Sequence, residues 1–151
     1  LWLSKRYTPP QLFPFVWACG SVDVERMDEG SRYLLGKRDF ASLKNAGTDL
    51  RTTVRTILSI TRTPEGPLPE GCLELTWRFE ADGFLKQMVR NTMGLLVAVG
   101  RGKLEPADIP GILDACDRRI APLTAPACGL TMKKVWYDDT FPLAASGHEG
   151  A

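Results

Sequence analysis

Alternating apolar and polar residues mark two strands in the middle of the chain. In residues 72–82 every second side chain is apolar, which is the period of a strand with one buried face. Residues 50–63 are rich in β-branched residues, which favour strands. The prolines and glycines of residues 64–71 require a turn, so the two strands are predicted to form a hairpin with a long connection. The inward face of the second strand is predicted to hold Leu73, Leu75, Trp77, Phe79 and Ala81, and one face of the first strand Val54, Thr56, Leu58 and Ile60.

A change to helical spacing follows the second strand, over residues 84–99. Its broad apolar face is predicted to pack on the sheet. The opposite side is only partly polar: it carries Arg90, with Gly94 four residues later leaving room above that side chain. We therefore expect the back of this helix to meet another part of the protein as well. The broad face consists of Phe84, Leu85, Met88, Val89, Thr92, Leu95, Leu96 and Val99.

Two further helices are predicted from apolar stripes and end signals. In residues 21–36, Asp23 is a suitable N-cap and Gly36 a suitable residue after the last turn. A shorter helix is predicted within residues 106–119. The stripes consist of Val24, Met27, Ser31, Leu34 and Leu35 in the first helix, and Ile109, Ile112, Leu113 and Cys116 in the second.

The remaining segments complete the expected topology. Residues 13–20 and 129–139 are predicted to be strands, residues 37–49 have the composition of a loop, and residues 1–3 look like the end of an earlier strand. The order is a split β-α-β-β-α-β pattern. It predicts an α+β domain over residues 1–140, with an antiparallel sheet and helices packed on one face, and a flexible tail over residues 141–151.

Composition and charge exclude some classes of protein. The 151 residues, 44% hydrophobic and 25% charged, suit one globular domain, and the formal net charge of +1 means that any nucleic-acid site must be a local basic patch. No apolar run approaches the roughly 20 residues of a membrane span. The single His148 and the absence of C-x-x-C spacing argue against a metal site. The cysteines, Cys19, Cys72, Cys116 and Cys128, are predicted to be buried thiols in a reducing cytoplasm.

An antiparallel sheet with one open face supports several functions. It can bind single-stranded RNA, as in RRM-like modules, although the chain lacks an RNP1-like aromatic motif. It can also serve as a ferredoxin-like interaction domain without RNA, because the same topology carries unrelated functions. The pattern of residues by itself leaves these alternatives open.

Four segments resemble, in order and spacing, the bacterial tRNA pseudouridine synthase A family. These segments are "MDEGSRYLLGKRDFASL" (residues 27–43), "TTVRTI" (52–57), "FEADGFLKQMVRNTMGLLVAVGRGK" (79–103) and "APACGLTMKKVWY" (125–137). Lys37 and Arg38 stand where a histidine often precedes "DF" in that family, Leu43 replaces a frequent phenylalanine, and Met132 replaces a leucine.

One motif of that family is absent from the chain. The "R-T-D-A-G-V-H" string that carries the family's nucleophilic aspartate does not occur, and the residues flanking Asp49 do not match it. The chain therefore resembles the C-terminal half of such an enzyme, and by itself it is expected to be inactive.

The resemblance implies a reaction and its partners. Family members isomerise uridine to pseudouridine at positions 38 to 40 of the tRNA anticodon stem-loop, without a cofactor or metal. The target base must leave its stack to reach the active site. A homodimer, a cytoplasmic location and a partner in the N-terminal half of the same protein are also implied.

The same resemblance assigns roles to individual residues. Arg90 matches the arginine of the family's "MVRN" motif, which pairs with the catalytic aspartate, whereas the simpler interpretation is a surface ion pair with Glu80 or Asp82. Leu130 matches the leucine that packs against the target base, although it could equally be a core residue. The candidate phosphate contacts are Arg51, Arg55, Lys86, Arg101 and Lys103, each of which could also be an ordinary surface charge.

Overall fold

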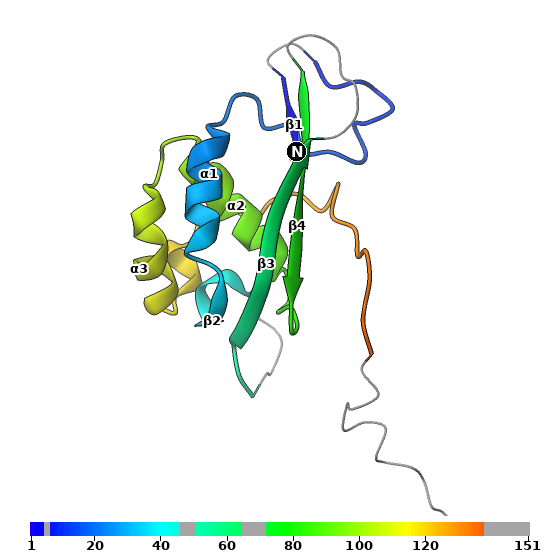
Figure 1. The fold of residues 1–151 in the computed structure, drawn as a ribbon. Helices are drawn as coiled ribbons and strands as arrows, with labels where there is room; N and C mark the ends of the chain where they lie inside the picture. Colours follow the sequence, from blue (N-terminus) through cyan, green and yellow to red (C-terminus); the bar gives the residue numbers. More distant parts are fainter. Residues whose placement is uncertain (5–6, 46–50, 65–71, 138–151) are drawn as a thin grey trace, which may run out of the picture.

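The chain folds into a four-stranded sheet with helices packed against it (Figure 1). The structure, a computed structural model, describes residues 1–4, 7–45, 51–64 and 72–137. The strands are β1 (Trp2–Leu3), β2 (Gly36–Asp39), β3 (Val54–Pro64) and β4 (Leu73–Ala81), in the order β1-β4-β3-β2. All three pairings are antiparallel. The α+β class predicted from the sequence is confirmed, whereas the predicted tail over residues 141–151 lies outside the described residues.

Three α-helices and three short 3-10 helices complete the described part of the chain. The α-helices are α1 (Val24–Arg32), α2 (Met88–Gly100) and α3 (Ile109–Asp114). The 3-10 helices are η1 (Ala41–Leu43), η2 (Pro106–Asp108) and η3 (Arg118–Ile120). In Figure 1 the three α-helices lie to one side of β3 and β4, which gives the predicted arrangement of helices on one face.

The predicted hairpin is confirmed, but one of its faces is not. Strands β3 and β4 pair from Ile57 with Ala81 to Pro64 with Leu75, and the register shifts between Ile57 and Ser59. This irregularity interrupts the alternation of side chains along β3. As a result Ile57 is buried, at 1% exposure, whereas Leu58 is 61% exposed. The predicted placement of Leu58 on one face with Val54, Thr56 and Ile60 is therefore wrong.

Residues 36–39 form an edge strand where the sequence predicted a loop. Gly36 to Asp39 pair with Ile57 to Val54 of β3, although residues 36–38 are exposed. Backbone hydrogen bonds to β3, rather than burial of one face, hold this strand in place. Its sequence therefore shows no hydrophobic alternation. Gly36 does not close α1, which already ends at Arg32; with φ of +83° it begins β2 in a conformation that favours glycine.

Residues 13–20 do not form the predicted buried strand. The backbone turns twice, with the N–H of Leu12 bonded to the carbonyl of Pro9 and that of Phe15 bonded to Leu12. Phe13 and Phe15 are 71% and 68% exposed. Only Ala18 forms a bridge, parallel to Trp2 of β1. Proline cannot donate to a strand ladder, so Pro14 weakens a strand at this position.

Residues 129–137 likewise do not form the predicted last strand, and residues 138 and 139 lie outside the described residues. The segment has no assigned secondary structure, and Met132, Trp136 and Tyr137 are 78%, 63% and 87% exposed. In Figure 1 it runs down on the side of the sheet opposite the helices. Apolar alternation produces a strand only where a neighbouring strand satisfies the backbone, and the described residues offer none here.

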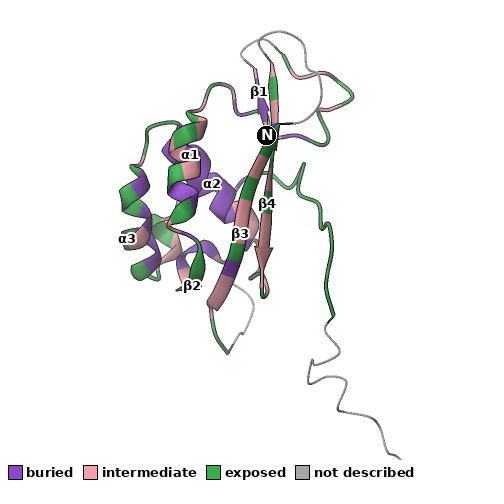
Figure 2. Cartoon of the chain, in the orientation of Figure 1, coloured by how far each residue is buried: buried purple, intermediate pink, exposed green. Residues whose placement is uncertain are grey.

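Helix α2 forms the centre of the core (Figure 2). It begins at Met88 rather than at Phe84, after Gln87 in a left-handed conformation with φ of +62°, and Phe84 is 43% exposed. Residues 91–100 are all buried, on both sides of the helix. The prediction that the back of this helix meets another part of the protein is therefore confirmed.

The two other helices agree with the sequence in most details. The Asp23 carboxylate accepts a hydrogen bond from the Arg26 N–H at 3.0 Å, as expected for an N-cap. Ile109, Ile112 and Leu113 of α3 are buried. Cys116, however, is exposed, so its predicted inward position is wrong. The chain turns away there, because Cys116 has a φ of +49°.

The prediction of four buried cysteine thiols holds in full only for Cys19, since Cys72 and Cys128 are half-buried and Cys116 is exposed. Cys19 is buried, and burial raises the pKa of its thiol to about 11, so it stays protonated at neutral pH. In the described part of the chain, no group of His, Cys, Asp and Glu side chains could hold a metal ion. Nor does that part contain a helix long and apolar enough to cross a membrane.

Candidate active site

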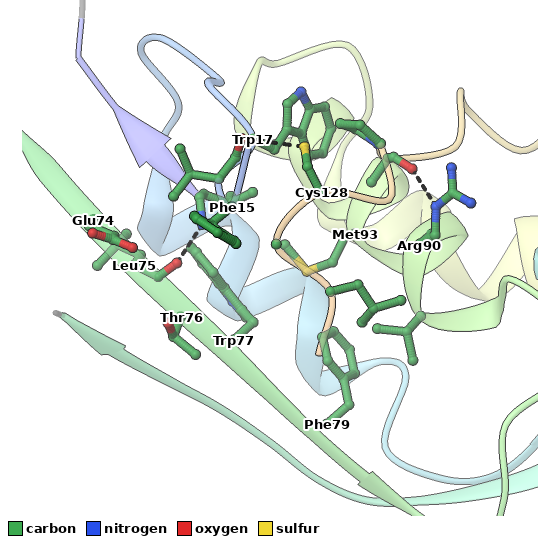
Figure 3. Close-up of a pocket in the computed structure, with 17 residues that line it drawn as sticks. Phe15, Trp17, Glu74, Leu75, Thr76, Trp77, Phe79, Arg90, Met93 and Cys128 are labelled. Atoms are coloured by element: carbon green, nitrogen blue, oxygen red, sulfur yellow. Dashed lines mark hydrogen bonds between the residues drawn. The ribbon is translucent and has the colours of Figure 1, made fainter. Parts of the chain in front are cut away.

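A pocket lies between strand β4, the first turns of helix α2 and two loop segments (Figure 3). Strand β4 contributes residues 74–77 and 79, and α2 contributes Val89, Arg90 and Met93. The loop segments contribute residues 15–17 and residues between 125 and 130. In Figure 3, Trp77 and Phe79 extend from β4 towards Met93, and Arg90 lies on α2 at the opposite side of the pocket. Residues far apart in the sequence therefore meet around one space.

Arg90 lies at the edge of this pocket in an unusual hydrogen-bonding environment. Its Nε donates to the carbonyl oxygen of Ala125 at 2.7 Å, and its own carbonyl accepts from the Ala125 N–H at 3.1 Å. The Nε bond orients the side chain, and the terminal Nη nitrogens have no acceptor among the described residues. A half-buried guanidinium favours a carboxylate or phosphate as its partner.

The simpler interpretation of Arg90, a surface ion pair with Glu80 or Asp82, is wrong for the described residues. Glu80 accepts a hydrogen bond from the Ser59 hydroxyl, and Asp82 accepts one from the Thr56 N–H. The ion pairs in the described part of the chain join Arg26 to Glu105, Arg62 to Asp28 and Arg119 to Asp117.

Leu130 lines the same pocket as Arg90, although forty positions separate the two residues. It follows a turn in which the Leu130 N–H bonds to the carbonyl of Ala127. Its side chain is 52% exposed, so it is not a core residue. The structure therefore brings to one pocket two residues that the family resemblance had selected from separate segments.

Aromatic residues of β4 form the wall of the pocket, a role that the sequence did not assign to them. Trp77 and Phe79 are partly buried against the core and also line the pocket. The Trp77 indole N–H is buried and has no hydrogen-bond partner among the described residues. Their alternation in the sequence identified the face of the strand but gave no sign of a neighbouring space.

The five basic candidates do not gather around this pocket, and none of them lines it. Arg55 donates to the carbonyls of Val54 and Thr52, and Arg101 donates to the carbonyl of Cys19. Lys86 precedes α2 and Arg101 follows it, so roughly 20 Å of helix separates them. Arg51, Lys86 and Lys103 are exposed. Lys86 and Arg101 therefore lie at opposite ends of α2.

Comparison with known proteins relates this arrangement to one family. Residues 31–138, which include Arg90 and Leu130, match the family model described as tRNA pseudouridine synthase. The tRNA pseudouridine synthase A of Lawsonia intracellularis is 60% identical over 139 residues, which are 91% of this chain and 54% of that protein. The tRNA pseudouridine synthase A of Nitratidesulfovibrio vulgaris is 48% identical over 91% of this chain and 57% of that protein. The tRNA pseudouridine synthase A of Geobacillus kaustophilus is 40% identical over 82% of this chain and 45% of that protein.

Two statements follow from these matches. The chain spans about half the length of the curated relatives that it matches. The family model covers well over half of the chain itself. The chain belongs to the tRNA pseudouridine synthase family.

Proposed function

We propose that the chain forms the C-terminal half of an isomerase that converts uridine to pseudouridine at positions 38 to 40 of the tRNA anticodon stem-loop. The observation that carries the proposal is the shared pocket of Arg90 and Leu130, with the Arg90 terminal nitrogens unbonded among the described residues. The relatives named tRNA pseudouridine synthase A support this reaction and this substrate.

The reaction requires charge and shape rather than added chemical groups. The bond between N1 of uracil and C1′ of the ribose breaks, the base turns, and a bond forms between C5 and C1′. The C5 proton is lost and N1 gains a proton, so the product is an isomer of the substrate and no external oxidant or reductant is consumed. This balance is the chemical reason for expecting no cofactor.

In this proposal Arg90 holds the nucleophilic aspartate, which another part of the protein supplies. The planar guanidinium can bind a carboxylate through two parallel hydrogen bonds and hold it near C1′ or C6 of the target nucleotide. Leu130 packs against the flat face of the displaced base and excludes water from it. Trp77 and Phe79 close the apolar wall on the other side.

The same proposal names the partners of the chain. The N-terminal half of the same protein completes the site and contributes the aspartate, and two complete subunits form a homodimer. Because tRNA is the proposed substrate, we place the enzyme in the cytoplasm. The exposed apolar side chains of residues 130–137 support a partner on that side of the molecule, since isolated domains seldom leave so many exposed together.

The activity itself is tested with two forms of the protein. The 151-residue chain and the complete protein that contains it are each incubated with an unmodified tRNA transcript, and pseudouridine is mapped chemically. The complete protein is expected to modify one or more of positions 38 to 40, and the chain alone is expected to show no turnover. Turnover by the chain alone would contradict the assignment of the nucleophile to another segment. Inactivity of the complete protein would contradict the proposed reaction.

Binding of tRNA by the chain alone is expected to be weak and strongly dependent on salt. Each phosphate contact releases counterions, so three to five contacts from Arg51, Arg55, Lys86, Arg101 and Lys103 predict a slope of about −2 to −4 for log K against log salt concentration. Arg55→Ala is expected to reduce this slope by about 1. Fluorescence anisotropy at several salt concentrations measures both quantities.

A matched control uses a cation outside this set. Arg32→Ala, at the exposed end of α1, is expected to leave the slope unchanged. Tight binding with a slope near zero would instead favour the alternative of an RRM-like RNA-binding module that reads bases. Absence of any tRNA binding would favour an interaction domain without RNA.

A further inference from the structure

A polar cluster lies directly behind Arg90, on the side of α2 that the apolar pattern left unexplained. Its centre is Arg118 of η3, whose Nη1 donates to the carbonyls of Ala121 and Pro122 at 3.1 and 3.2 Å. Its Nη2 donates to the Asn91 side-chain oxygen at 3.1 Å and to the Thr124 hydroxyl at 2.9 Å. The neighbouring Asp117 carboxylate forms an ion pair with Arg119, with 2.7 Å between Asp117 Oδ2 and Arg119 Nη2. Arg118 is therefore satisfied by neutral groups and has little capacity left for a ligand.

The second member of the cluster, Asn91, is the helix residue next to Arg90. It is only 1% exposed. Its Oδ1 accepts from Arg118 and, at 2.6 Å, from the Thr124 hydroxyl. Its Nδ2 donates to the Leu43 carbonyl at 2.7 Å and to the Asn45 side chain at 3.2 Å. All four hydrogen-bonding positions of the amide are used, which fixes its orientation in the core.

Residues 121–125, which we call the crossing segment, connect this cluster to Arg90. The segment passes so close to α2 that a Cβ atom at Gly94 would overlap the carbonyl oxygen of Leu123. At one end of the segment, the Arg118 guanidinium donates to the carbonyls of Ala121 and Pro122 and to the Thr124 hydroxyl. At the other end the Ala125 N–H donates to the Arg90 carbonyl, and the Ala125 carbonyl accepts from the Arg90 Nε.

We propose that the Arg118–Thr124–Asn91 cluster is a positioning device that sets the orientation of the Arg90 guanidinium through the crossing segment. The Ala125 carbonyl is the only acceptor of the Arg90 side chain among the described residues, so its position decides where the terminal nitrogens point. That position depends on the adjacent Thr124, which is held by both Arg118 and Asn91. The catalytic consequence rests on the proposed function, whereas the geometric claim does not.

The geometric claim is tested on the 151-residue chain by NMR. Thr124→Val keeps the shape of the side chain and removes its hydroxyl, and Thr124→Ser restores the hydroxyl. In Thr124→Val, hydrogen exchange at the Arg90 Nε–H is expected to rise roughly tenfold, since its bond to Ala125 opens more often. Thr124→Ser is expected to match the parent chain. Thr61→Val, at an exposed position of β3, is the control for the loss of a hydroxyl.

The catalytic consequence is tested in the complete protein by a double-mutant cycle. Thr124→Val is expected to lower the single-turnover rate about tenfold with little change in tRNA affinity, because a misplaced group slows chemistry without weakening binding. In the Arg90→Ala background the same change is expected to alter the rate less than about twofold, since the group being positioned is absent.

Two results would overturn the inference. One is an unchanged Arg90 Nε–H exchange rate in a folded Thr124→Val chain, which would show that the cluster does not control the orientation of the guanidinium. The other is a full additional rate loss from Thr124→Val when Arg90 is already alanine. If Arg90→Ala alone retained full activity, the proposed function of Arg90 would fail, and the exchange measurement would still decide the geometric claim. If Thr124→Val does not fold, Arg118→Lys, which keeps the charge and loses the fork, serves in its place.

Discussion

Replacing Arg90 by alanine in the complete protein is expected to slow pseudouridine formation on the order of 10²–10³-fold, the usual effect of removing preorganised charge from an active site. The complete protein is expected to remain folded, with a moderate loss of stability. The change removes one hydrogen bond and leaves the Ala125 carbonyl without its donor, which costs about 1–3 kcal/mol. Single-turnover rates at saturating tRNA, together with a melting curve, measure the two effects separately.

Lysine at the same position is expected to restore little of the rate. Its single charged nitrogen cannot bond the Ala125 carbonyl and at the same time present a planar fork to a carboxylate. Arg78→Ala, at an exposed position of β4, is the matched control and is expected to leave the rate unchanged. A full-speed Arg90→Ala enzyme would remove Arg90 from the catalytic site. A variant that only unfolds would show that the partner of the arginine is structural.

Replacing Gly94 by alanine is expected to destabilise the chain, although alanine is the better helix former. The helix preference gains about 1 kcal/mol, but the added methyl group overlaps the Leu123 carbonyl oxygen, and overpacking of a core costs about 1–3 kcal/mol. The overlap involves backbone, and Arg118 and Arg90 hold that backbone on both sides, so the upper end of this range applies. We expect a net loss of about 1–2 kcal/mol, which lowers Tm by roughly 3–8 °C.

The same change is expected to reduce activity in the complete protein, because the crossing segment must move away from α2. A displacement of about 1 Å near a catalytic group can cost up to about 10²-fold in rate. Gly111→Ala is the matched control: Gly111 lies in α3, and an added Cβ there meets nothing within 4 Å. That variant is expected to be as stable as the parent chain or slightly more stable. A Gly94→Ala chain that melts at or above the parent temperature would show that the crossing segment yields easily.

The sequence by itself determined the elements whose stability depends on a regular pattern. The β3–β4 hairpin and the buried α2 could be predicted because alternation and helical spacing report directly which side of an element faces the core. The N-cap of α1 at Asp23 was predictable for a similar reason, since capping uses only neighbouring residues. The motif residues Arg90 and Leu130 were found through their resemblance to a family, and the structure then placed them around one pocket.

Only the tertiary structure decided the features that depend on a distant partner. Strand β2 exists because β3 offers it hydrogen bonds, whereas the apolar residues 129–137 have no such neighbour among the described residues and stay extended without pairing. The register shift beside Leu58 interrupts the alternation of buried and exposed side chains along β3, and no local sequence pattern predicts it. The bond between Arg90 and Ala125 joins residues 35 positions apart. Local sequence fixes which surfaces are apolar, but the long-range contacts that satisfy backbone and charge appear only when the chain is packed.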